Sequence, residues 1–157
     1  MNNIYKLIFI LLFTFLGCSY NPNEDKVILK IIDNLDMNIF SRNGDKIYSV
    51  SSPQSSYDNN LQKFKLQKTT INIFKGEETI YVINSDKSTL SENNTLLELN
   101  GNVKLKTIQQ NDDIIYADNF IWNIEEANYL LKGNIRFENK NIILNSSKAK
   151  LGKNNII

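Results

Sequence analysis

The side chains with the greatest potential for chemistry in this 157-residue chain are carboxylates, because the sequence contains no histidine and one cysteine. The lack of histidine excludes serine–histidine catalysis and the usual zinc sites. Two carboxylates can still act as acid and base on a glycosidic bond. The candidates between residues 112 and 126 lie in expected turns or occur singly on a strand face, as solvated polar residues do: Asp112, Asp113, Asp118, Glu125 and Glu126. We therefore expect no enzyme, no metal and no other cofactor.

The cysteine, Cys18, directly follows an uncharged apolar run from Leu7 to Leu16. This run is about half as long as a helix that crosses a bilayer, which indicates a secretory signal. The junction "FLGC" resembles the lipobox of bacterial lipoproteins, in which the cysteine is lipidated and becomes the mature N-terminus. We expect a signal peptide over 1–17, a lipid anchor at Cys18 with a tether over 18–25, and one domain over 26–157. An uncleaved signal anchor and a buried structural thiol are the alternatives.

The charge pattern argues against a nucleic-acid partner. Lysine and arginine number 18 and aspartate and glutamate 17, and neither sign occurs in blocks. A nucleic-acid binder needs a basic patch to neutralise phosphates. The hydrophobic content of 41% instead supports a packed core.

Short alternating apolar and polar segments fill the chain after residue 40 and predict an all-β fold. They are rich in Ile, Val, Leu, Tyr, Phe and Thr, and Asn, Asp, Gly or Ser bound each one. We expect a turn at Asn43-Gly44 and a loop at Pro53. The segment 26–40 fits either a helical face or a strand, and its β-branched content favours the strand.

Two of these segments have nearly the same residue pattern, "LNGNVKLKT" at 99–107 and "LKGNIRFEN" at 131–139. Each places a glycine, Gly101 or Gly133, on the apolar face of the strand. A glycine inside a strand indicates a bulge, a bend, or room for something close to the backbone. The flanking segments 83–94, 115–126 and 144–155 repeat as well, so a unit of strand, turn and strand recurs about every thirty residues, as in stacked β architectures.

These residues resemble the LptC and OstA-like proteins of lipopolysaccharide export. The resemblance rests on "NG" followed by "KIYSVSS", on "LELNGNVKL", on "YADNFIW" and on the second "GNI", in that order over 39–151. It implies a half-open antiparallel β-jellyroll, in which two sheets face each other across an apolar groove. It also implies a carrier that takes lipopolysaccharide, or a related glycolipid, from an inner-membrane ABC transporter and passes it to a periplasmic β-jellyroll partner.

The same resemblance implies that partners join by pairing of edge strands. The region from Met37 to Val50 would meet the transporter subunits, and "NIILNSSKAKL" would meet the downstream partner. The expected location is the periplasmic face of the inner membrane. The lipobox-like anchor replaces the spanning helix of better-known members, and Ser19 after the cysteine leaves sorting to the outer membrane open.

The expected groove lining consists of inward-facing residues on the alternating segments. They are Tyr48, Val50, Ile71, Ile73, Tyr81, Ile83, Leu97, Leu99, Gly101, Val103, Leu105, Tyr129, Leu131, Gly133, Ile135 and Phe137. Ordinary core packing is the competing interpretation for every one of them, and for Phe120 and Trp122 it is favoured. The alternative function is a structural or adhesive all-β envelope lipoprotein, which would have a filled core and no bound lipid.

Overall fold

The computed structural model describes residues 29–91, 95–108 and 113–151. The expected signal peptide, Cys18 and the tether lie outside these residues. Eight strands follow one another in a single antiparallel sheet whose spatial order is the chain order. The strands are β1 (Leu29–Phe40), β2 (Lys46–Asp58), β3 (Lys63–Lys75), β4 (Glu78–Leu90), β5 (Leu96–Thr107), β6 (Ile114–Asn123), β7 (Asn128–Glu138) and β8 (Ile143–Leu151).

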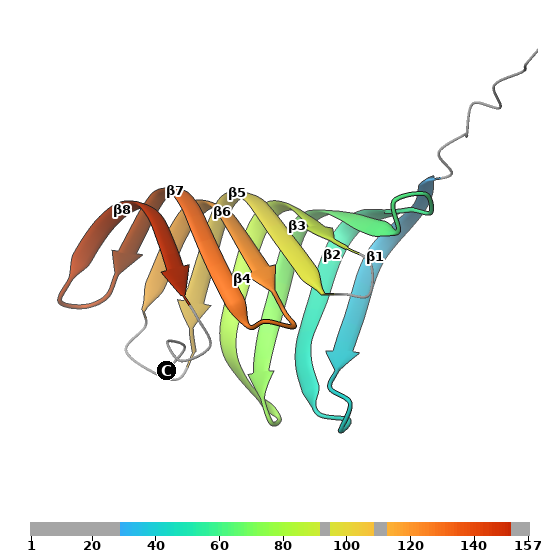
Figure 1. Ribbon diagram of the computed structural model, residues 1–157, viewed down its shortest axis with the longest axis horizontal. Coiled ribbons are helices and arrows are strands. Elements are labelled where there is room, and N and C mark those ends of the chain that lie inside the picture. The colour runs from blue at the N-terminus through green and yellow to red at the C-terminus, as the bar shows by residue number, and fades with distance from the viewer. Residues whose placement is uncertain (1–28, 92–94, 109–112, 152–157) are drawn as a thin grey trace, which may run out of the picture.

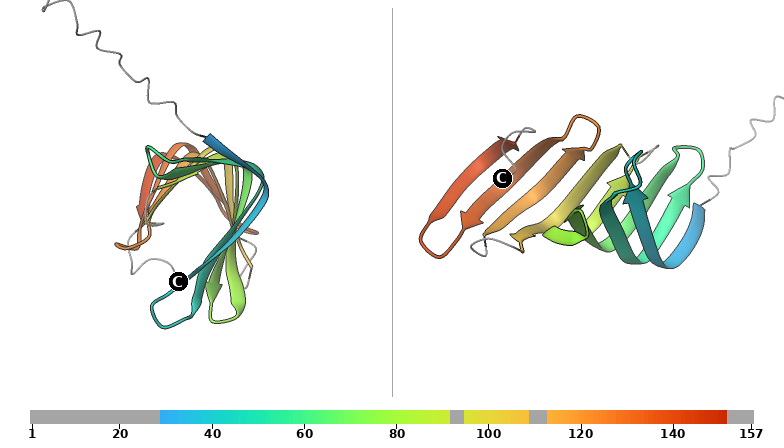
Figure 2. Two further views of the ribbon diagram at one scale, coloured as in Figure 1. Left: turned by 90° about the vertical axis from the view of Figure 1, so that its right-hand side faces the viewer. Right: turned by 90° about the horizontal axis from the view of Figure 1, so that it is seen from below.

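The sheet is strongly curved and encloses an interior, as the end-on view in Figure 2 shows. Along the long axis the strands lie side by side from β1 at one end to β8 at the other (Figure 1). The expected all-β antiparallel fold is confirmed, and so is the extended structure expected for most of 26–40. The two facing layers are limbs of the same strands, however, and hydrogen bonding runs through one continuous sheet.

A line of bends across the middle of the strands produces this shape. The odd-numbered strands bend at residues with left-handed backbone: Asn34, Lys68, Gly101 with Asn102, and Gly133 with Asn134. The pairing between neighbouring strands is interrupted at the same level in β4–β5, β5–β6, β6–β7 and β7–β8. Such bulges increase the local twist and turn the strand direction. Each strand therefore contributes a segment to both limbs.

The two glycines are required by this bend. Gly101 has a φ of 75° and Gly133 a φ of 70°, a region that side chains disfavour. A Cβ atom at Gly101 would lie 2.8 Å from Oδ2 of Asp86, and one at Gly133 would lie 2.9 Å from Cβ of Asp118. Both aspartates are solvent-exposed. The sequence interpretation of a strand bend is thus confirmed, whereas the space beside each glycine is taken by a carboxylate and leaves no room for a ligand there.

The prediction of a loop at Pro53 is wrong. This proline lies inside β2, opposite the left-handed Asn34 of β1 and at a point where β2 and β3 are not paired. A proline lacks the N–H group that a strand ladder needs, so it is tolerated where the ladder is interrupted. The turn expected at Asn43-Gly44 is confirmed, with Gly44 N donating to Ser41 O at 3.0 Å.

Apolar side chains from both limbs fill the middle of the interior. Across it, the rings of Tyr48 on β2 and Trp122 on β6 lie 5.1 Å apart between centroids, although the two strands are not neighbours. Burying a large apolar side chain contributes about 1.5–3 kcal/mol. The completely buried members of this core include Tyr48, Val50, Ile71, Ile83, Leu90, Leu97, Leu99 and Phe120.

Candidate functional site

The inward faces of the strands form continuous apolar rows that run along the length of the molecule. Each row is made by residues that are direct partners in successive strand pairs. The row next to the bend consists of Met37, Val50, Ile71, Ile83, Leu105, Ile115, Phe137 and Leu144. Because inward and outward positions alternate in a strand, one apolar residue per strand at this level is enough to keep the row unbroken.

The burial of this row changes from the middle of the molecule to its C-terminal end. Val50, Ile71 and Ile83 are fully buried, and Phe137 on β7 is half-buried. Leu144 on β8 leaves 60% of its surface exposed. The apolar interior is therefore closed in the centre and open to solvent at β8.

The sequence-predicted lining residues other than Gly101 and Gly133 lie on this inward face, whereas the Cβ position of each of the two glycines faces an exposed aspartate. Half-buried are Tyr81, Leu105, Tyr129 and Phe137, and Gly101 and Gly133 lie at the bends. Ile115 and Leu144 also belong to this row. They were not predicted as lining residues from the sequence, although each lies in an alternating segment. The buried members are Tyr48, Val50, Ile71, Ile73, Ile83, Leu97, Leu99, Val103, Leu131 and Ile135.

An aromatic cluster closes the interior where the two limbs approach each other. Trp122 lies between Tyr48 and Tyr129, with ring centroids at 5.1 Å and 5.5 Å, and the rings of Phe120 and Tyr129 are 5.8 Å apart. Burial raises the pKa of Tyr48, and burial together with the nearby Tyr81 raises that of Tyr129. The Nε1 atom of Trp122 is buried without a hydrogen-bond partner. These phenols stay neutral at physiological pH, so they supply no acid or base.

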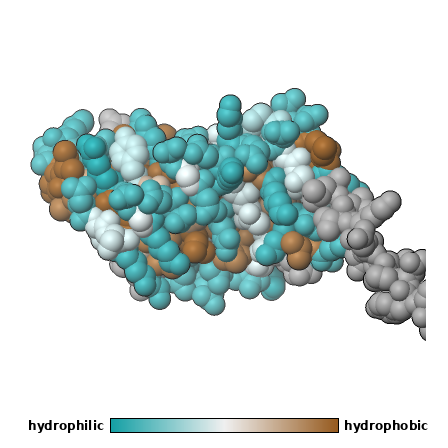
Figure 3. Space-filling view, turned by 90° about the horizontal axis from the view of Figure 1, so that it is seen from above, coloured by the Kyte–Doolittle hydropathy of each residue, from teal (hydrophilic) through white to brown (hydrophobic). Residues whose placement is uncertain are grey.

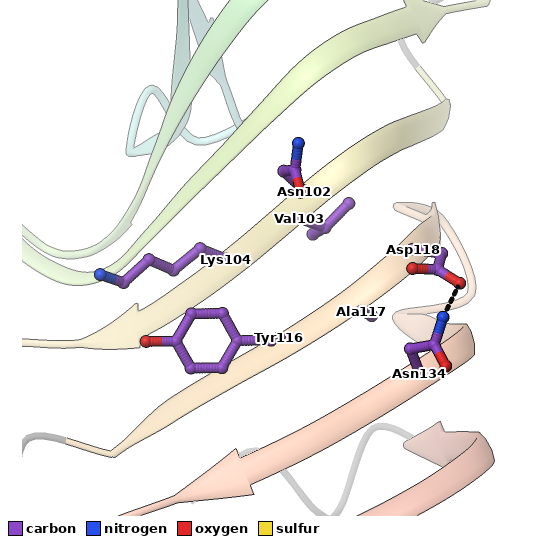
Figure 4. A pocket seen from close by; sticks show the side chains of 7 residues that line it. All are labelled: Asn102, Val103, Lys104, Tyr116, Ala117, Asp118 and Asn134. Atoms are coloured by element: carbon purple, nitrogen blue, oxygen red, sulfur yellow. Dashed lines mark hydrogen bonds between the residues drawn. The ribbon is translucent and has the colours of Figure 1, made fainter.

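The outer surface at the bend carries polar side chains. A pocket of about 350 Å³ lies between β5, β6 and β7, and it includes Asn102, Lys104, Tyr116, Asp118 and Asn134 (Figure 4). Asn134 Nδ2 donates to Asp118 Oδ2 at 2.9 Å, and this bond ties two bends together. The carboxylate is occupied in holding the bend, and the arrangement provides no pair of facing acids.

The other candidate carboxylates are not brought together either. Glu125 and Glu126 are exposed in the turn after β6, and Asp113 is half-buried beside Thr107. Asp112 lies outside the described residues. The geometry offers no acid and base pair among the described carboxylates of this group.

The two ends of the sheet, β1 and β8, each pair with one neighbour only among the described strands. This corrects the expected N-terminal edge region, Met37 to Val50, because its second half belongs to β2, which pairs with both β1 and β3. The edge on that side is β1 alone. The space-filling view in Figure 3 shows a largely hydrophilic face with hydrophobic patches at the end where β8 lies, in the middle and toward the opposite end.

An open, folded antiparallel sheet with an apolar interior is a β-jellyroll-like scaffold. The chain matches the family described as lipopolysaccharide-assembly, LptC-related, over residues 7–154. It therefore belongs to the LptC-related family, which confirms the resemblance seen in the sequence. No individual curated protein matches the chain significantly.

Family membership sets the general role of the protein. LptC-related proteins are periplasm-facing components of the inner-membrane lipopolysaccharide transporter, and the family is not one of enzymes. The chain thus takes part in lipopolysaccharide transport. Within the described ranges, no helix is long and apolar enough to cross a membrane.

Proposed function

We propose that this protein is a non-enzymatic carrier that passes lipopolysaccharide, or a related glycolipid, along its apolar interior. In this proposal Cys18 carries the lipid anchor and holds the domain at the periplasmic face of the inner membrane. The lipid arrives from the ABC transporter at β1 and leaves toward a periplasmic β-jellyroll partner at β8. Each acyl CH₂ that is buried contributes about 0.8 kcal/mol, so apolar side chains alone can hold the ligand.

The observation that carries the proposal is the continuous apolar row that ends at the exposed Leu144. A protein that needed only a packed core would have little reason to extend the row to an edge where 60% of a leucine remains in water. Exposed apolar surface of this kind marks sites of interaction with lipids or proteins. The open end at β8 is thus where we expect acyl chains to be handed on.

Pairing through the edge strands extends the interior into the neighbouring proteins. An edge strand presents unpaired N–H and C=O groups to any strand that can align with it. β-strand addition makes the interior of the two sheets continuous without new side-chain chemistry. The proposed contacts are therefore β1 with the transporter and β8 with the downstream partner.

Site-specific photocrosslinking tests the proposal. Leu144 and the preceding residue, Ile143, are both 60% exposed, but they point to opposite faces of β8. With a benzophenone amino acid at each position, purified lipopolysaccharide should crosslink to position 144 and not to position 143. Equal labelling of both positions, or labelling of neither, would contradict a path along the inward face.

A structural or adhesive lipoprotein remains the second candidate because the middle of the interior is packed. Tyr48, Leu97 and Leu99 have no exposed surface, which is what a filled core requires. Mass spectrometry of the protein from its own envelope separates the two. An acylated Cys18 with co-purifying lipopolysaccharide supports the carrier, whereas an acylated chain without lipid supports the structural role.

A further inference from the structure

One buried hydrogen-bond donor faces the interior without a partner. Trp122 on β6 is 3% exposed, and its Nε1 atom makes no hydrogen bond. Among the described residues, the one other buried side-chain polar atom without a partner is Oδ1 of Asp113, which lies just before β6. A buried N–H group that is left unpaired costs free energy because it has given up its bond to water. The indole N–H is therefore a donor that the folded chain itself does not use.

The side chains that flank the indole supply no strong acceptor. The ring of Tyr48 is tilted by 58° to it at a centroid distance of 5.1 Å, and the ring of Tyr129 is stacked on it at 19° and 5.5 Å. Leu97, the strand partner of Trp122, is fully buried and purely apolar. An aromatic face accepts only a weak hydrogen bond. An oxygen atom that reached Nε1 would gain a hydrogen bond that these neighbours do not provide.

Trp122 lies at the border between the closed and the open part of the interior. Leu90, Leu97, Trp122 and Tyr129 are direct partners in successive strand pairs and form one inward row. The two leucines have no exposed surface, whereas Tyr129 on β7 is half-buried. A ligand that enters from the β7–β8 end thus meets Tyr129 first and Trp122 next.

Two further donors lie at this border. Tyr81 on β4 and Tyr129 on β7 both precede the bend, but their strands run in opposite directions, so the two phenols belong to opposite limbs. Burial, and then the nearby Tyr81, raise the pKa of Tyr129. Both phenols keep their protons at neutral pH and can donate hydrogen bonds across the opening.

The surroundings of the indole restrict the kind of acceptor that fits. A phosphate or a sugar ring would bring several polar atoms into an apolar site, and most of them would lose their hydrogen bonds to water. The carbonyl of an ester or amide brings few polar atoms and continues into an alkyl chain. Such a group matches a single N–H donor next to buried leucines.

We propose that the indole N–H of Trp122 donates a hydrogen bond to the carbonyl oxygen of an acyl ester or amide in the bound lipid, an assignment that rests on the proposed function and names a specific donor within it. The linkage at the head of an acyl chain is then held at the border, while the chain itself lies along the apolar rows. This role goes beyond the closing of the core that the sequence favours for Trp122.

The indole signal in a proton–nitrogen correlation spectrum tests this contact directly, because Trp122 is the only tryptophan in the sequence. The full chain with isotope-labelled tryptophan is kept in an alkyl maltoside, a detergent without a carbonyl group. Diacyl phosphatidylglycerol with ester links should move the indole proton downfield, as a new hydrogen bond does. The matched dialkyl ether lipid, which lacks the carbonyls, should bind without that shift.

Replacement of the N–H group alone gives the second test. Trp122→benzothienylalanine keeps the shape of the side chain and puts sulfur in place of the N–H. It should weaken binding of the ester lipid by about two- to tenfold and leave binding of the ether lipid unchanged. Urea denaturation without lipid should show no loss of stability, because the folded chain does not use this donor. A clear loss of stability would show that the N–H is bonded within the protein and would overturn the inference.

The same spectrum with purified lipopolysaccharide identifies the source of the carbonyl. A downfield shift with lipopolysaccharide assigns the donor to the glycolipid, and a shift with the phospholipid alone assigns it to a phospholipid. Equal shifts with ester and ether lipids, or no shift with any lipid, overturn the inference, and the wild-type spectrum decides this even if the variant does not fold. Crosslinking of lipopolysaccharide at position 144 with an unmoved indole signal would leave the carrier proposal intact.

Discussion

The closed centre and the open C-terminal end of the folded sheet use the same apolar row in different ways. In the centre, Ile83 is flanked by strands on both sides and faced by the opposite limb, and it has no exposed surface. At the end, Leu144 occupies the equivalent place on an edge strand and remains 60% exposed. The difference shows that the neighbours of a residue, rather than its type, divide this row into a stabilising core and an accessible surface.

Truncation of one leucine in each region should give the largest contrast. Leu99→Ala removes a fully buried side chain from the centre and should lower the free energy of unfolding by about 2–5 kcal/mol. Leu144→Ala removes an exposed one and should change it by less than about 0.5 kcal/mol. Urea denaturation of both variants measures the two values. Similar losses would mean that β8 is as well packed as the centre.

Replacement of the bend glycines should sharpen the comparison by testing what holds the two limbs together. Gly133→Ala places a Cβ atom in the left-handed region and against Asp118, and should cost about 2–3 kcal/mol of stability. Gly76→Ala is the control, because Gly76 also has a positive φ but no atom within 4 Å of its Cβ position. Thermal unfolding should show a smaller loss for the control. An equal loss of stability in both variants would show that the contact with Asp118 does not add to the cost of Gly133→Ala.

The smallest effect is expected from pH at the turn between β2 and β3. Asp58 accepts hydrogen bonds from the backbone N–H groups of Leu61 and Asn60, and with Lys65 nearby these bonds lower its pKa. Its contribution is therefore present above the unfolded pKa of about 3.9 and is lost as the pH falls through the lower folded pKa. The stability difference between the wild type and Asp58→Asn should shrink below about pH 3.9. Denaturation curves at pH 7 and pH 3 measure it, and a gap that does not change with pH would contradict the role of the charge.

The sequence predicted the strands well because alternation is a local property. The inward positions of the second repeat, such as Leu131 and Ile135, were readable from spacing alone, and both are buried. The polar network at the bend was missed. Asp86 and Asp118 are 32 residues apart, as are Asn102 and Asn134, so the repeat itself contained the signal that each aspartate serves the next Gly-Asn pair.

What the sequence alone determined is the all-β class, the repeated two-strand unit and membership of a lipopolysaccharide-transport family. These follow from residue order within short segments and from motifs that keep their spacing. The tertiary structure decided that the bends form one line, that Pro53 lies inside a strand, and that the apolar row is buried at Ile83 and exposed at Leu144. Burial depends on strands that come together from distant parts of the chain, and an alternating pattern is the same whether one neighbour is present or two.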